Sequence, residues 1–342
     1  MPANPNPSLK AVARIAKASI STASRALHGH SRLLPATIQA VRAAARRVGY
    51  QTNPFISGTM RRVRNRGQLG HLGAIAYLTF HDTSQGWRRN STYLRFHEGA
   101  SRRAQDLGFQ LDTIWAREPR MHAKRLTSIL VARGIVGVVV GPRPAQPRPD
   151  LLDWERFSTA CVGVPLPEVK LHQAGSHHSR LLARALTVLE ERRYRRVGLV
   201  LLESQVSKTE PGWVATWCHR QEQTEARLRV PLLVLPALDS DRIARWLRRF
   251  RPDAVIGLHD ELADIVRECG HRVPEEVGFA HLSRADRPDA PAGMDQRPRV
   301  IGAAAVDLVT NQIFSGERGV ARMPHALLIE GEWIDGWSVR PA

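Results

Sequence analysis

Residues 8–53 read SLKAVARIAKASISTASRALHGHSRLLPATIQAVRAAARRVGYQTN and decide the fold of the first part of the chain. Apolar side chains recur three or four positions apart in three runs of this stretch, a spacing typical of short helices that share one core. Ser19 is a good N-cap for the second helix, and Pro35 suits the first position of the third. Lys17 and Ala18 leave only a tight connection between the first two helices. The stretch therefore predicts a helix-turn-helix, in which the second helix enters the DNA major groove.

The second predicted helix offers several side chains to DNA. Ile20, Ser21 and Ser24 alternate with the apolar Ala23 and Leu27, so we expect these three to reach base edges. A serine hydroxyl can pair with any base, and an isoleucine can contact a thymine methyl group. Other polar side chains of this region are expected on phosphate or sugar, which fixes the position of the helix without reading sequence. They are Ser19, Thr22 and Arg25.

The positive charge of the chain is concentrated in the same region. The formal net charge is +18, and residues 1–67 contain 12 Lys and Arg and no Asp or Glu. The first carboxylate of the chain is Asp82. A segment without carboxylates is attracted to phosphate by counterion release, and its affinity falls steeply as salt rises. A solvated basic face is the simpler interpretation of a charge run, but coincidence with a helix-turn-helix favours nucleic-acid binding.

Three segments of this region resemble a known family. S-L-K-A-V-A-R-I-A, S-I-S-T-A-S-R-A-L and T-I-Q-A-V-R-A-A-A-R-R-V-G-Y-Q-T-N-P are similar to the N-terminal domain of the lactose-repressor (LacI/GalR) family of bacterial transcription regulators. Lys17 stands where a turn glycine is usual in that family, and Leu34 where a capping serine is usual. We expect the turn either to avoid a positive φ at Lys17 or to tolerate it at a cost of about 1 kcal/mol. The resemblance implies a repressor that binds a palindromic operator as a homodimer.

Residues 53–67 follow as a short basic segment. In the family this position holds a hinge helix that folds against its twin when both lie in the DNA minor groove, and Asn53 suits the cap of such a helix. The wedge leucine of the family falls on Thr59, so the resemblance implies that Met60 is the wedge. Arg61 follows at a position where a phosphate contact would be useful. An ordinary basic linker is the alternative.

From His71 onward, apolar runs typical of strands alternate with amphipathic helical patterns. Such alternation predicts right-handed crossovers and parallel sheets. We expect two doubly wound α/β lobes, an arrangement known as the periplasmic-binding-protein-like fold and also that of the family's effector domain. The predicted domains are a helix-turn-helix domain of residues 1–52, the hinge segment 53–67 and a two-lobed effector-binding and dimerisation domain of residues 68–342. The predicted lobes are an N-lobe of about 68–171 and 297–326 and a C-lobe of about 172–296.

Ligands of such folds bind at the carboxyl ends of the strands, here in the cleft between the lobes. Aromatic side chains there would stack on a sugar or another ring, and polar ones would hydrogen-bond hydroxyl groups. The candidate effector-binding residues are Trp87, Tyr93, Trp213, His259, Asp260, Asp295 and Gln296. They predict a sugar or a related polyol as the effector. Trp213 stands where the family often has an effector-binding Arg, and Ala280 where it has a ligand-binding Asp.

The sequence indicates no enzyme, cofactor or metal. It contains no glycine-rich phosphate loop, G-x-S-x-G or H-E-x-x-H motif. Its three cysteines lie far apart, and the adjacent His177 and His178 would point to different sides of a helix, which disfavours a metal pair. No apolar run is long enough to span a bilayer, and the first ten residues lack the apolar core of a secretory signal, so we expect a cytoplasmic protein. Two alternatives stay open: a regulator of this fold without a small-molecule effector and, less favoured, a solute-binding protein.

Overall fold

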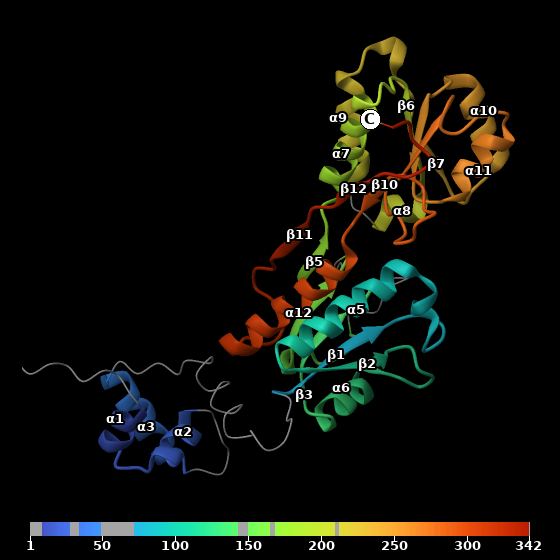
Figure 1. Ribbon diagram of the computed structural model, residues 1–342. Coiled ribbons are helices and arrows are strands. Elements are labelled where there is room, and N and C mark those ends of the chain that lie inside the picture. The colour runs from blue at the N-terminus through green and yellow to red at the C-terminus, as the bar shows by residue number, and fades with distance from the viewer. Residues whose placement is uncertain are drawn as a thin grey trace, which may run out of the picture. The chain divides into compact units, whose positions relative to one another are not determined.

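The structure is a computed structural model that describes residues 9–27, 34–48, 72–142, 150–164, 168–208 and 212–341 (Figure 1). It divides into two compact units, residues 1–72 and 73–342. Within the described ranges, no helix is both long and apolar enough to cross a membrane. The predicted hinge segment, residues 53–67, lies outside the described residues.

The first unit contains the three helices that the apolar spacing predicts. They are α1 (Leu9–Ile15), α2 (Ile20–Leu27) and α3 (Pro35–Val48). Their shared core is made of small side chains, and its buried members are Val12, Ala13, Ala23, Ala26, Val41, Ala44 and Ala45. Because most of these side chains end at Cβ, the core is thin and each helix keeps most of its surface outside it.

The turn between α1 and α2 places Lys17 in the left-handed region, with a φ of 49°. The N–H of Ala18 donates to the carbonyl of Ala13 at 3.0 Å and closes the turn. A residue with a Cβ is strained in this region by roughly 1–2 kcal/mol, which glycine avoids. The expectation of a tolerated positive φ at Lys17 is therefore confirmed, and the alternative of a turn that avoids it is wrong.

The first sheet of the second unit is six-stranded, in the order β11-β5-β4-β3-β1-β2, and all its neighbours are parallel. We call this sheet and its helices the N-lobe. Its strands are β1 (Ala74–Thr79), β2 (Gln110–Trp115), β3 (Ile135–Val140), β4 (Ser158–Val162), β5 (His172–Ser176) and β11 (Ala326–Ile329). Its helices are α5 (Ser91–Asp106), α6 (Ala123–Ala132) and α12 (Pro298–Ser315), with 3-10 turns η1 (Gly86–Arg89) and η2 (Trp154–Arg156).

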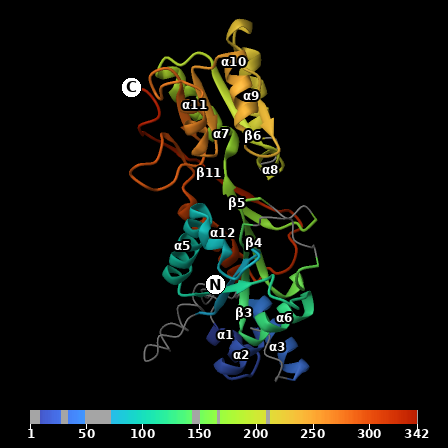
Figure 2. The same cartoon turned by 90° about the vertical axis from the view of Figure 1, so that its right-hand side faces the viewer.

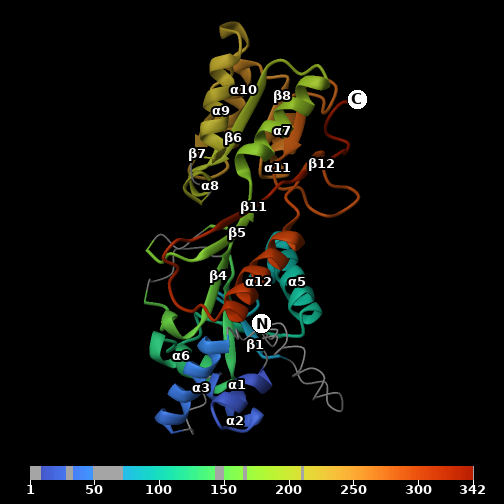
Figure 3. The same cartoon turned by 90° about the vertical axis from the view of Figure 1, so that its left-hand side faces the viewer.

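Helices α5 and α12 come from opposite ends of the second unit and lie side by side (Figures 1 and 3). Glycines allow their close approach. A Cβ at Gly99 would overlap the carbonyl oxygen of Arg299, and one at Gly302 would overlap that of Phe96. Helix α6 packs through Leu126 with the core side chains of β1 and β3.

The second sheet is also six-stranded, in the order β12-β10-β9-β8-β6-β7, and we call it and its helices the C-lobe. Only β12 runs antiparallel to its neighbour within this sheet. Its strands are β6 (Val197–Leu202), β7 (Leu233–Leu235), β8 (Ala254–Gly257), β9 (Gly278–His281), β10 (Gly293–Asp295) and β12 (Glu332–Ile334). Its helices are α7 (His178–Glu191), α8 (Glu203–Lys208), α9 (Gly212–Gln223), α10 (Ser240–Phe250) and α11 (Glu261–Glu268), with a 3-10 turn η3 (Ala226–Leu228).

Successive side chains of the C-lobe strands point to opposite faces, so each face has its own core. Ala254 and Ile256 of β8 pack with α7 and α9, whereas Val255 packs with α10 and α11. Figure 2 shows α10 and α11 with the rest of the C-lobe above the α5–α12 pair. Both lobes are doubly wound, and the predicted fold class is confirmed.

The lobe boundaries need a correction. Residues 172–176 were expected in the C-lobe, but β5 pairs with β4 and β11 in the first sheet. Near the end of the chain, β11 pairs in parallel with β5, while β12 pairs with β10 of the other sheet. The chain therefore changes lobe after β5 and again between β11 and β12. Short strands of mixed composition, such as HQAGS in β5, carry too little apolar periodicity to be assigned without their neighbours.

Candidate functional site

The start of α2 is built as the sequence predicts. The N–H of Thr22 donates to Oγ of Ser19 at 3.0 Å, so Ser19 caps the helix. The hydroxyl groups of the two residues also lie 2.8 Å apart. The carbonyl of Leu34 accepts from the N–H groups of Thr37 and Ile38 at the start of α3, which compensates for the missing capping serine.

Helix α2 turns its apolar and its exposed residues to different sides. Ala23 and Ala26 are fully buried, whereas Ile20 is 50% exposed and Ser21 is exposed. A half-exposed isoleucine at the first position of a polar helix face is available for contact with a partner. The side chain of Ser24, the third predicted base-reading residue, lies outside the described residues. That Ile20 and Ser21 read bases stays a prediction.

All the charged side chains described in the first unit are basic and exposed. Lys10, Arg14, Lys17, Arg42, Arg46 and Arg47 are all exposed. The whole of residues 1–67 supplies no carboxylate that could neutralise them. The remaining predicted DNA contacts, Asn53, Thr59, Met60 and Arg61, lie outside the described residues, and so does the position of the Arg25 side chain.

The predicted aromatic residues of the N-lobe are largely covered. Trp87 in η1 is 3% exposed, its Nε1 donates to the carbonyl of Ser84 at 3.1 Å, and its ring centroid lies 4.6 Å from that of His97. Tyr93 in the first turn of α5 lies edge-on to His81, with ring centroids 5.6 Å apart. Burial raises the pKa of the Tyr93 phenol. These rings pack within the lobe, and their role in effector binding stays a prediction.

Trp213 begins α9 and is 2% exposed. Its ring lies edge-on to His178, the first residue of α7, with centroids 4.8 Å apart. Burial lowers the pKa of His178 to about 4, so this imidazole is neutral at physiological pH. Residue 213 therefore keeps its indole in a dry, uncharged environment, where the resemblance implied a charged arginine.

His259 and Asp260 lie at the end of β8 and meet residues that the sequence did not single out. Nε2 of Gln205 lies 2.8 Å from Nε2 of His259. Asp260 accepts from Arg287 at 2.7 Å and lies 3.7 Å from Nε2 of His281. Burial lowers the pKa of His281 to about 4, and the neighbouring Asp260 carboxylate only partly opposes this.

Asp295 and Gln296 connect the lobes. Arg95 of α5 lies 3.7 Å from the Asp295 carboxylate. Gln296 is 8% exposed, accepts from the Ser176 hydroxyl at 2.8 Å and donates to the carbonyl of Leu282 at 2.9 Å. Because its amide already bonds to β5 on one side and to the C-lobe on the other, Gln296 is well placed to hold the lobes together.

Four buried side-chain polar atoms find no partner among the described residues: Tyr77 Oη, His81 Nδ1, Arg95 Nε and Trp213 Nε1. His81 follows the carboxyl end of β1, Arg95 lies in the second turn of the helix after it, and Trp213 starts the helix after β6 and α8. A buried polar atom without a partner costs about 1–3 kcal/mol. These atoms lie in the elements that follow strand carboxyl ends, where ligands of open α/β sheets bind.

Sequence reasoning missed His81, Arg95, Gln205 and His281. His81 and His281 had a usable signal, since each stands at or just after the end of an apolar strand run. No sequence signal marks Arg95 or Gln205. Each lies within a helix, and the sequence does not show which polar residue of that helix faces a binding site.

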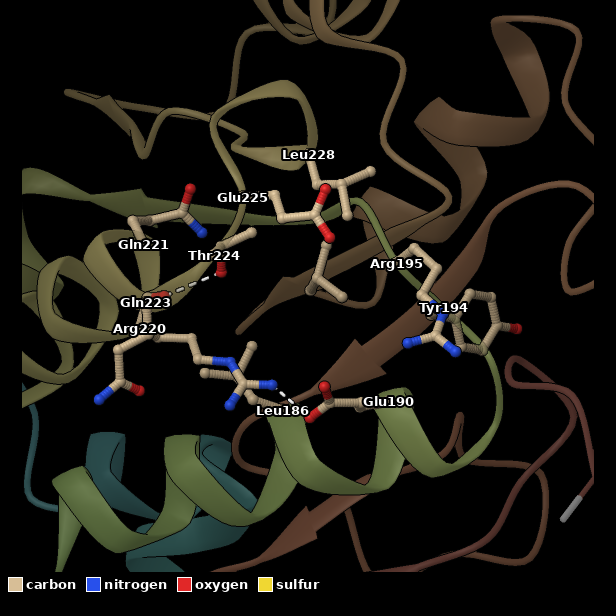
Figure 4. A pocket seen from close by; sticks show the side chains of 11 residues that line it. Leu186, Glu190, Tyr194, Arg195, Arg220, Gln221, Gln223, Thr224, Glu225 and Leu228 are labelled. Atoms are coloured by element: carbon tan, nitrogen blue, oxygen red, sulfur yellow. Dashed lines mark hydrogen bonds and ion pairs between the residues drawn. The ribbon is translucent and has the colours of Figure 1, made fainter.

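A separate pocket of about 240 Å³ lies on the C-lobe between α7 and the end of α9 (Figure 4). The guanidinium of Arg220 donates to the Glu190 carboxylate across it. Val197 in its wall starts β6, so the pocket lies at the amino end of that strand. None of the predicted effector-binding residues lines it.

Metal and disulfide sites are not found in the described ranges. No group of three or more His, Cys, Asp or Glu there could hold a metal ion. His177 instead caps α7 by accepting from the N–H of Arg180, and Cys161, Cys218 and Cys269 are not joined in disulfides within these ranges.

Comparison with known proteins addresses both units. The sequence model of the family described as "Bacterial regulatory proteins, lacI family" matches residues 8–53. A solved complex of the transcriptional regulator CelR with cellobiose has a TM-score of 0.58 at 20% identity, covering 97% of this chain and 100% of that one. A lac repressor dimer bound to operator and the anti-inducer ONPF has a TM-score of 0.55 at 16% identity, covering 97% and 98%. The transcription regulator CcpA of Lactococcus lactis has a TM-score of 0.56 at 11% identity, covering 78% and 99%.

No curated protein sequence matched the chain. At these low identities the solved structures establish the fold, including the two-lobed second unit, and leave the ligands of this chain to be tested.

Proposed function

Residues 8–53 make this chain a member of the lacI family of bacterial regulatory proteins, and on that premise we propose that it is a sequence-specific transcription regulator. It binds a palindromic operator as a homodimer and represses transcription. As a DNA-bound regulator it acts in the cytoplasm, and the proposal assigns it no catalytic role.

The exposed face of α2 carries this proposal. Ile20 and Ser21 are exposed on the helix that enters the major groove in such domains, while the small core holds the helix from the opposite side. The surrounding cations, with no carboxylate in residues 1–67, supply affinity for phosphate. Together they provide the two terms that specific DNA binding needs: attraction to the backbone and contact with base edges.

A dimer follows from the symmetry of the site. Two copies would place two α2 helices in successive major grooves, about 34–36 Å apart. Residues 53–67, with Asn53, Thr59, Met60 and Arg61, would then lie in the minor groove between them. The solved lac repressor dimer on its operator supports this arrangement by analogy of fold.

Selection of bound duplexes from a random pool, at physiological salt, tests the proposal. We expect a two-fold symmetric consensus. Recovery of no consensus, with affinity that follows salt alone, would reject a sequence-specific regulator. Ser21→Ala should change the selected sequence, and Arg25→Ala should weaken binding to the selected site and to random duplex alike.

We propose further that a small polyhydroxyl molecule, a sugar or related polyol, controls DNA binding from the cleft between the lobes. The unpartnered atoms His81 Nδ1, Arg95 Nε and Trp213 Nε1 support it, because hydroxyl groups can donate to the first and accept from the other two. The cellobiose complex of CelR, a regulator with the same fold, is consistent with a sugar. The ligand would shift the population between lobe arrangements, so operator DNA would change its affinity by the same factor.

A melting-temperature screen against sugars, polyols and nucleotides tests the effector. A ligand present at 100 times its Kd stabilises the folded state by about 2.7 kcal/mol. Trp213→Phe keeps a ring but removes Nε1, and we expect it to abolish that gain. Trp246→Phe is the matched control, since its Nε1 donates to Pro231 elsewhere in the C-lobe; it should lower stability but preserve the ligand effect.

Regulation without a small molecule is the second candidate. The burial of Trp87 and Trp213, together with Ala280 at the place of the family's ligand-binding Asp, favours it. A screen in which no compound raises the melting temperature of a protein that selects a symmetric DNA site would support this second candidate.

A further inference from the structure

Helix α10 lies at the edge of the C-lobe (Figure 1) and contains four arginines. Ile243, Trp246 and Leu247 fix the helix to the C-lobe core. Arg242, Arg245, Arg248 and Arg249 are all exposed. Arg242, Arg245 and Arg249 are spaced three and four residues apart, so their side chains emerge along one side of the helix.

These arginines differ from most others in the second unit. Many exposed arginines elsewhere meet carboxylates, such as Arg156 with Asp153 at 2.7 Å and Arg272 with Glu276 at 3.0 Å. Others without an ion pair among the described residues, such as Arg120 and Arg318, do not gather on one helix. Among the described residues, no ion pair is formed by any arginine of α10, although the exposed Asp241 lies in its first turn. The carboxylate of Asp239 at the start of α10 instead caps the helix by accepting from the backbone N–H of Arg242.

The neighbouring chain extends this surface. The guanidinium of Arg196 donates to the carbonyls of Arg251, at 3.1 Å, and of Phe250 and Arg227. Its bonds hold the loop with Arg195 against the end of α10. Arg251 at the end of α10 is exposed and, within the part of the chain that the structure describes, forms no ion pair. The side chain of Arg195 instead lines the pocket between α7 and α9 with Glu190 and Glu225 (Figure 4).

We define the α10 basic surface as Arg242, Arg245, Arg249 and Arg251. Arg248 is left out because it lies toward α11: Arg248 and Glu268 act electrostatically on the same Cys269 thiol.

The side chains of this surface are better suited to bind a phosphate backbone than to bind another protein. Protein interfaces have an apolar centre, and none of the exposed large apolar side chains of the described residues belongs to α10 or to the loop of Arg195. A phosphate backbone requires only cations at suitable spacing, and the planar guanidinium matches phosphate geometry with paired donors. Cations that lack carboxylate partners need not break an ion pair to bind.

We infer that the α10 basic surface binds the phosphate backbone of duplex DNA, as a second contact separate from the helix-turn-helix. Binding there does not read sequence, because no side chain is shaped to enter a groove. Its strength falls with salt by counterion release. A regulator with such a surface can hold a second stretch of duplex while its helix-turn-helix occupies a first.

The full-length protein, saturated with a duplex that its helix-turn-helix binds, is titrated with a labelled random 16-base-pair duplex at 50 to 200 mM salt. The triple variant Arg242→Gln, Arg245→Gln, Arg249→Gln is compared with Arg156→Gln, Arg184→Gln, Arg272→Gln. The control triple changes the net charge equally at exposed arginines that have carboxylate partners. Glutamine has a helix propensity close to that of arginine, and unchanged melting temperatures verify that both variants fold.

We expect wild type and control to bind the second duplex, and the α10 triple variant to lose about 2.7 units of the logarithmic salt slope for it, equal to about 40-fold between 50 and 200 mM salt. Binding of the first duplex stays unchanged. Saturation of the wild type by one duplex alone, or equal losses in both triples, would overturn the inference. Equal binding of poly-glutamate in place of the second duplex would show a general anion surface and overturn the assignment to phosphate.

The test of the α10 basic surface and the test of the proposed regulatory function can fail independently. Failure to select a symmetric site would reject the proposed regulator. The number of duplexes bound per protein could still be measured with any duplex that the first unit binds.

Discussion

The two units of this protein differ in how far their Lys and Arg side chains are paired with carboxylates. In the first unit, residues 1–67 contain 12 Lys and Arg without one carboxylate, and the described ones are exposed. In the second, many arginines lie against acids, as Arg103 does with Asp307 at 2.6 Å. Positive charge therefore indicates a nucleic-acid partner best where arginines gather without ion pairs, as they do on α10 among the described residues.

The largest expected difference between the two units is in how their stability responds to acid. His178 and His281 of the second unit are buried, which lowers each pKa from 6.5 to about 4, so the folded state binds fewer protons than the unfolded state below pH 6.5. Lowering the pH from 7 to 4.5 should reduce the free energy of unfolding of the second unit by on the order of 2 kcal/mol for each histidine. Residues 9–27 and 34–48 contain no Asp, Glu or His, so these helices should be insensitive.

Hydrogen exchange measures both units in one sample, through the protection of β1 and of α1 to α3. His281→Asn should remove part of the pH dependence. Equal loss of protection in both units would contradict the predicted difference.

The next largest effect is expected from the close packing of α5 against α12 in the second unit. Gly302→Ala places a Cβ against the carbonyl of Phe96 and should lower the free energy of unfolding of the second unit by about 3 kcal/mol. Urea unfolding followed by tryptophan fluorescence measures it, since all eight tryptophans lie in the second unit. Arg102→Ala on the exposed side of α5 is the control and should change stability by less than about 0.5 kcal/mol. A small effect of Gly302→Ala would mean that α5 and α12 can move apart at little cost.

A smaller effect is expected at the DNA face. Ile20→Ala removes a half-exposed side chain, so it should leave stability nearly unchanged but weaken binding to the selected site about tenfold, by loss of a thymine methyl contact. Binding to random duplex should be unaffected. Comparison of the two dissociation constants checks this, and equal losses on both duplexes would place Ile20 outside the base-reading surface.

The smallest effect is expected in the turn of the first unit. Lys17→Gly relieves the positive φ but frees the unfolded chain, so it should stabilise the three helices by no more than about 1 kcal/mol. Exchange protection of α1 to α3 measures the gain. Ala18→Gly is the control; it adds chain freedom without relieving a positive φ and should destabilise.

The helices of both units and most of the central strands could be predicted from the sequence, because their apolar spacing is local. Ser19 as a cap needed only its own neighbours, and the hydrogen bond from Thr22 confirms it. The strands β4, β5 and β10 could not be assigned in this way. Five or fewer residues buried by partners from elsewhere in the chain carry little periodicity of their own.

The candidate effector site was less predictable for the same reason. The sequence offers Trp213 and Gln296 as candidate effector-binding residues, but only the folded chain places the indole against His178 and bonds the Gln296 amide to Ser176 and Leu282. A sequence tells which groups are polar. Whether a polar group is free for a ligand depends on neighbours from other elements, some of them far along the chain, as Ser176 is from Gln296.

The sequence by itself determined the helix-turn-helix and its attraction to phosphate, since helix caps, apolar spacing and the absence of acids act over a few residues or through total charge. The tertiary structure decided how Arg95 meets Asp295, which lobe receives β5 and β11, and which arginines are left without acids. Those outcomes depend on contacts between segments that are distant in the sequence, and these contacts form only in the folded chain.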